Sequence, residues 1–64
     1  MRAPLPQGEL TRADVATGLR SLETLRARML GAASERDEAR LIGKYRRIAD
    51  AIAPYVEGKR AYRA

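Results

Sequence analysis

The chain has 64 residues, which is enough for one small domain but not for a large hydrophobic core. It contains no Cys and no His, which excludes disulfides, thiolate or imidazole metal sites and the commonest general base at neutral pH. Thirteen Lys and Arg against eight Asp and Glu give a net charge of +5, which suits phosphate-bearing or acidic partners but fits an Arg- and Ala-rich codon bias equally well.

Residues 1–10 are predicted to form an extended N-terminal arm, because Pro4, Pro6 and Gly8 interrupt regular structure. This segment lacks the apolar middle region of a secretory signal. No apolar run in the chain approaches the ~18 residues of a membrane span. We therefore expect a cytoplasmic protein without membrane contact.

A first helix is predicted from about Arg12 to Leu30. Thr11 is a typical N-cap, and Asp14 occupies the reciprocal position of a capping box. Gly31 is expected to end the helix in a left-handed conformation. Between these ends, apolar residues recur every three or four positions and form one stripe: Val15, Leu19, Leu22, Leu25 and Met29.

An alternative interpretation breaks this segment in two. Residues 21–26 look like the start of a recognition helix, so that residues 15–28 would form a helix-turn-helix-like unit with Gly18 in its turn. Arg20, Thr24 and Arg28 would then face DNA. The apolar stripe keeps its helical phase through the supposed turn, however, and Gly18 costs a continuous helix only about 1 kcal/mol. We therefore favour one unbroken helix.

A second helix is predicted from about Glu35 to Ala53, with Ser34 as its N-cap. The connection between the helices is so short that they must be antiparallel neighbours. Pro54 either kinks this helix or ends it and starts a separate short C-terminal turn. Its apolar residues alternate steps of four and three, in the heptad manner of a coiled coil: Leu41, Tyr45, Ile48, Ile52 and Tyr55.

A basic stripe follows steps of four, four and three along the second helix, roughly opposite the apolar seam: Arg36, Arg40, Lys44 and Arg47. Beyond Gly58, residues 59–64 form a basic tail that adds further candidate phosphate-binding residues: Lys59, Arg60 and Arg63. The competing explanation is the solvated outer face that any amphipathic helix has, since Asp37 and Asp50 border the stripe and no aromatic residue interleaves with it.

The sequence predicts no enzyme, cofactor or metal site. The acidic residues Glu35, Asp37 and Glu38 lie where a helix dipole favours negative charge, which explains them without an active site. No serine has a His partner to activate it, and Gly43-Lys44 lacks the upstream glycine of a phosphate-binding loop.

The expected architecture is all-α. Residues 11–58 form an antiparallel helical hairpin, and two hairpins pair into a four-helix bundle through the two apolar stripes, which one copy alone cannot bury. We expect a non-enzymatic protein–protein interaction module, such as an adaptor, assembly factor or inhibitor of the kind that phages and plasmids encode. It would act as a homodimer or on a larger protein partner. The alternative is a basic nucleic-acid-binding regulator that uses the stripe or residues 15–28.

Overall fold

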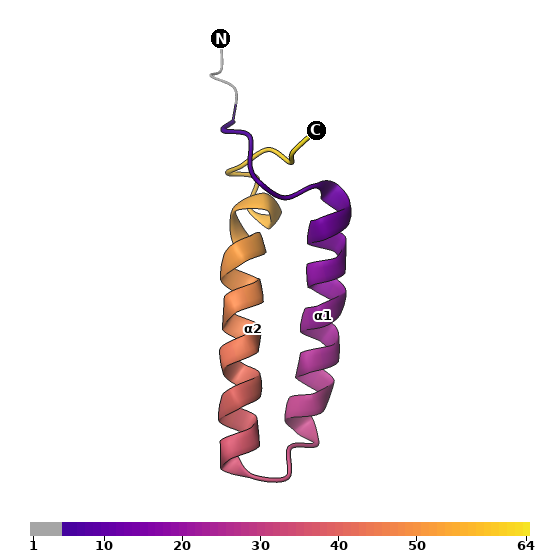
Figure 1. Cartoon of the computed structure of the whole chain (residues 1–64), viewed down its shortest axis with the longest axis vertical. Helices are drawn as coiled ribbons and strands as arrows, with labels where there is room; N and C mark the ends of the chain where they lie inside the picture. The colour runs from indigo at the N-terminus through magenta and orange to yellow at the C-terminus, as the bar shows by residue number, and fades with distance from the viewer. Residues whose placement is uncertain (1–4) are drawn as a thin grey trace.

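The structure is a computed structural model that describes residues 5–64, so the first four residues of the predicted arm lie outside it. Helix α1 spans Arg12–Leu30 and helix α2 spans Glu35–Val56. They run antiparallel and side by side, and the molecule measures 52 × 17 × 15 Å (Figure 1). The predicted all-α helical hairpin is therefore confirmed, whereas the pairing of two hairpins stays a prediction.

The first helix begins at the predicted capping box. The Thr11 hydroxyl oxygen accepts a hydrogen bond from the Asp14 backbone N–H at 3.1 Å, and the Thr11 backbone N–H donates to Asp14 Oδ2 at 3.0 Å. These two bonds satisfy N–H groups that have no partner within the helix. The helix is then unbroken through Gly18, which excludes the helix-turn-helix interpretation of residues 15–28.

Gly18 serves helix packing rather than a turn. A Cβ atom at this position would lie 3.1 Å from Cγ2 of Ile52 on α2, which is tighter than most such contacts. The missing side chain therefore allows the two helices to approach closely at this point, at the modest cost of a glycine in a helix interior.

The pKa of Asp14 provides a test of the capping box. Hydrogen bonds from the backbone and the side chain of Thr11 lower the pKa of Asp14. Because the folded pKa lies below the unfolded one, the contribution to stability is present above the unfolded pKa and is lost as pH falls through the folded pKa. We expect Thr11→Ala to lower the free energy of unfolding by about 1 kcal/mol. In an NMR titration of this variant, the pKa of Asp14 should rise part of the way to its ordinary value. An unchanged pKa would contradict the capping box.

The connection between the helices differs from the prediction at Gly31, whose φ of −103° is not left-handed. Helix α1 ends instead in a tighter turn, with hydrogen bonds that span three residues rather than four. The N–H groups of Gly31 and Ala32 bond to the carbonyls of Arg28 and Met29 at 3.1 and 3.3 Å, three residues back in each case. These bonds use two of the terminal carbonyls without requiring a left-handed residue, so the predicted C-cap geometry was wrong.

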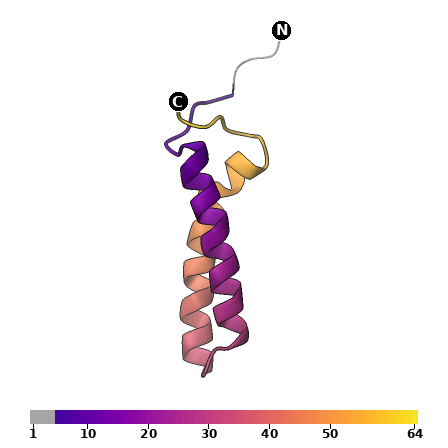
Figure 2. The same cartoon turned by 90° about the vertical axis from the view of Figure 1, so that its right-hand side faces the viewer.

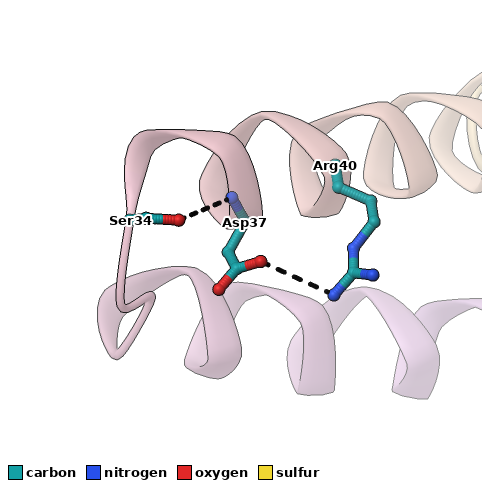
Figure 3. Close-up of polar contacts among 3 residues, drawn as sticks. All are labelled: Ser34, Asp37 and Arg40. Atoms are coloured by element: carbon teal, nitrogen blue, oxygen red, sulfur yellow. Dashed lines mark hydrogen bonds and ion pairs between the residues drawn. The ribbon is translucent and has the colours of Figure 1, made fainter.

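The second helix begins at Ser34, as predicted. The Ser34 hydroxyl oxygen accepts from the Asp37 backbone N–H at 3.2 Å (Figure 3). The carboxylate of Asp37 points forward along the helix, and its Oδ1 lies 3.8 Å from Nη2 of Arg40. Both side chains of this pair are well exposed, so we assign it little stability.

Pro54 lies inside α2, which continues three residues beyond the predicted end at Ala53. Figure 2 shows the last turn of α2 set off from the axis of the preceding turns, so the kinked alternative holds and no separate C-terminal helix follows among the described residues. A Schellman motif closes the helix: Lys59 N–H donates to the Pro54 carbonyl at 2.8 Å and Gly58 N–H to that of Tyr55 at 3.3 Å. Gly58, with φ +73°, is the left-handed residue that this motif needs.

The core is small and lies toward the end of the rod where residues 6–10 and 61–63 meet. Val15, Ile52 and Tyr55 form one buried cluster, and Leu25 is buried farther along the helix contact. Leu10, Leu22, Ile48 and Tyr62 pack against the cluster from the outside. No side chain of the part of the chain that the structure describes falls below 2 % exposure, so one copy provides only a thin interior.

The two chain ends pair with each other over this core. Ala61 N–H donates to the Pro6 carbonyl at 2.9 Å, and Gly8 N–H donates back to the Ala61 carbonyl at 2.8 Å. Arg63 N–H donates to the Leu10 carbonyl at 2.7 Å. We call residues 6–10 and 61–63 the terminal clasp. The described part of the predicted arm thus lies beside the predicted tail at one end of the hairpin (Figure 1).

Candidate functional site

The structure divides the predicted interface residues into two groups. The first group is buried between the helices of one chain and leaves little surface for another molecule: Val15, Leu25, Ile52 and Tyr55. The second group is at least partly exposed: Leu19, Leu22, Met29, Leu41, Tyr45 and Ile48. The apolar stripes therefore serve first to join α1 to α2, and only part of them remains for a partner.

A shallow apolar groove contains three residues of the second group. Leu19 and Leu22 of α1 and Tyr45 of α2 line it, with Glu23 and Arg26 also in its wall. Its volume is about 290 Å³, and Leu19 is 45 % exposed there. We call this feature the apolar groove. It presents aliphatic and aromatic surface beside one acidic and one basic side chain.

A second groove is lined by basic side chains. Arg20 and Arg28 of α1 and Lys44 and Arg47 of α2 contribute four cations to a groove of about 480 Å³. No Asp or Glu is among the described residues that line it. Hydroxyl side chains and two apolar residues complete the wall: Thr17, Ser21, Thr24, Leu25 and Ile48. We call this feature the basic groove.

The two grooves lie on opposite flanks of the helix contact. At ~100° per residue, Leu19, Glu23 and Arg26 project to one side of α1, and the residues of α1 in the basic groove project to the other side. The hairpin therefore has one flank suited to apolar contact and one flank suited to anions.

The predicted phosphate-binding residues are not gathered in one place. Lys44 and Arg47 line the basic groove, while the other two members of the stripe, Arg36 and Arg40, are exposed outside its lining. In the tail, Lys59 Nζ lies 3.1 Å from Oε2 of Glu57. Arg60 and Arg63 are exposed at the far end of the rod, by the terminal clasp.

Arg20 and Arg28 were missed as partners of Lys44 and Arg47. The helix-turn-helix alternative named both arginines, but for a turn that does not exist. The useful signal was the polar flank of α1, in which residues 17, 20, 21, 24 and 28 recur with helical spacing beside the apolar stripe. In an antiparallel hairpin this flank must adjoin one side of α2.

Neither helix in residues 5–64 combines the length and the apolar character that a membrane crossing requires. Within the same range, no three acidic side chains come together in a way that could hold a metal ion. No known protein family matches the chain, and no curated protein or solved structure matches it significantly.

Proposed function

We propose that the protein is a non-enzymatic helical interaction module that pairs with a second copy of itself through the apolar groove. The observation that carries this proposal is the exposure of Leu19, at 45 %, beside Leu22 and Tyr45, when residues 5–64 bury only four apolar side chains. Burying a Leu side chain completely contributes ~1.5–3 kcal/mol. A second copy that covers this groove adds to the interior that one copy lacks.

The distribution of charged side chains favours pairing through the flank that contains the apolar groove. Glu23 and Arg26 place one negative and one positive side chain beside the apolar groove. In a twofold interface, when one residue of a patch contacts a second residue of the other copy, the second contacts the first in return, so Glu23 of each copy can face Arg26 of the other. Pairing through the basic groove would instead bring four cations against four cations, which is repulsive. Two hairpins joined at the apolar groove form a four-helix bundle.

The pairing is tested by Leu19→Glu. A carboxylate in the apolar groove would be desolvated on association, so the variant should sediment as a single chain of 7.1 kDa while the wild type approaches twice that mass. Because Leu19 is largely outside the hairpin core, the variant should retain its helical circular dichroism. Ile52→Asp would not serve here, because Ile52 is buried within one chain and its loss would unfold the hairpin.

The matched control is Leu30→Glu. Leu30 is 88 % exposed, lies at the end of α1 and does not line the apolar groove. The control makes the same chemical change outside the proposed interface, so the Leu30→Glu chains should still pair. Equal dissociation of both variants, or an unaffected Leu19→Glu pair, would contradict the assignment of the interface to this groove.

A further inference from the structure

We infer that the basic groove binds the phosphate backbone of a double-stranded nucleic acid without reading its sequence. This inference goes beyond self-pairing and does not depend on it, because the basic groove lies on the opposite flank of the hairpin from the apolar groove. A paired molecule would carry two such grooves, both accessible.

The first support is the uncompensated charge of the groove. Arg20, Arg28, Lys44 and Arg47 line it, and none of them is in an ion pair within the described part of the chain. The two ion pairs of residues 5–64 lie elsewhere, at the start of α2 and after its end. Like charges brought together repel one another in the free protein, and an anion relieves that repulsion. Guanidinium groups are also suited to phosphate, which they bind through two parallel hydrogen bonds.

The second support is the character of the rest of the wall. Thr17 and Ser21 add hydroxyl groups of the kind that often contact phosphate oxygens. The Thr24 hydroxyl is occupied, because it donates to the Arg20 carbonyl at 3.2 Å. Leu25 and Ile48 complete the lining with apolar surface.

The dimensions of the groove fit a run of phosphates. Arg20 and Arg28 are eight residues apart on α1, which is about 12 Å along the helix axis. One strand of a duplex carries a phosphate about every 3.4 Å of its axis. A stretch of this length is long enough for the four cations of the groove to meet neighbouring phosphates of a duplex.

The absence of aromatic lining favours a duplex over a single strand. Proteins that hold single strands stack successive bases on aromatic side chains, each worth ~1–3 kcal/mol per base. Tyr45 lines the apolar groove, while Tyr55 and Tyr62 stack on each other by the terminal clasp, and none of the three lines the basic groove. The four cations along the groove match a run of phosphates, and contacts to phosphates carry no sequence information directly.

The test measures binding of the 64-residue chain to short DNA and RNA duplexes of unrelated sequences by fluorescence anisotropy over a series of salt concentrations. With four phosphate contacts, the slope of log K against log[salt] should be about −3 to −4 for duplex DNA. Arg20→Gln together with Arg47→Gln should weaken binding on the order of a hundredfold and reduce the magnitude of the slope by about 2. The tighter of the two duplexes identifies the natural source of the phosphates.

The control double variant is Arg36→Gln with Arg60→Gln, which makes the same change in net charge at exposed positions outside the groove. It should retain the wild-type slope and bind within about threefold of the wild type. If both double variants weakened duplex binding equally, the loss would be explained by net charge alone, and the inference would be overturned. Preference for a single strand, or binding to an acidic peptide but not to a duplex, would also overturn it. The monomeric Leu19→Glu variant should still bind a duplex, so failure of self-pairing and failure of this site are separable.

Discussion

Replacing Tyr55 by Ala is expected to unfold the isolated chain, while Tyr55→Phe should leave it folded but less stable. Tyr55 is 6 % exposed and packs with Val15 and Ile52 in the core. Its ring stacks on Tyr62 with centroids 5.6 Å apart, and its hydroxyl oxygen accepts the Leu10 N–H at 3.1 Å. One side chain thus joins both helices to the terminal clasp.

The magnitudes explain the difference between the two changes. Removing a large buried aromatic side chain costs ~3–5 kcal/mol, which is comparable with the entire stability expected for a domain of this size. Phe keeps the ring but leaves the Leu10 N–H without its acceptor, at a cost of ~1–3 kcal/mol. Urea denaturation followed by circular dichroism measures both. Val56→Ala, one residue along and 59 % exposed, is the control and should change stability by less than about 0.5 kcal/mol. A Tyr55→Ala chain as stable as this control would contradict the central role of Tyr55.

The same substitution, Gly→Ala, is expected to have opposite effects at Gly8 and Gly43. A Cβ at Gly8 would overlap the hydroxyl and ring of Tyr55, and the Gly8 N–H is held by the Ala61 carbonyl at 2.8 Å. Either the ring or the terminal clasp must move, at a cost of ~1–3 kcal/mol. A Cβ at Gly43, within α2, would meet no atom within 4 Å. There Ala removes the helix penalty of glycine, a gain of about 0.8–1 kcal/mol.

Urea denaturation gives the sign of each change, and hydrogen exchange locates it. In Gly8→Ala, the backbone amides at positions 8, 61 and 63 should exchange faster because their hydrogen bonds belong to the terminal clasp. Those of the middle of α2 should be less affected. Stabilisation by Gly8→Ala, or destabilisation by Gly43→Ala, would show that the packing around the glycine concerned differs from that described.

The parts of the fold that depend on neighbouring residues were predictable from the sequence. Thr11 and Ser34 cap their helices through residues three positions on, so the signal lies within a few letters of sequence. The end of α1 was not predictable in detail. The bonds of Gly31 and Ala32 back to α1 depend on the path of the connection rather than on residue preference. The continuation of α2 through Pro54 likewise depends on Tyr55, which packs into a core formed with α1.

Features that depend on residues far apart in the chain were predicted only in part. Alternation of apolar residues identified both stripes, but could not separate residues that join the two helices, such as Ile52, from those left at the surface, such as Leu19. The terminal clasp joins Gly8 to Ala61, and neither residue type signals such a pair. Half of the basic groove was visible as the stripe on α2. Its other half required knowing which flank of α1 lies beside that stripe.

The thermal midpoint as a function of protein concentration tests the central claim most directly, namely that one hairpin exposes apolar surface that a second copy covers. Pairing stabilises the folded state by mass action, so the wild-type midpoint should rise with concentration. The Leu19→Glu midpoint should not. A cooperative wild-type transition whose midpoint stays constant from dilute to concentrated solution would show that the single chain folds stably without a second copy. That result would contradict the proposed pairing.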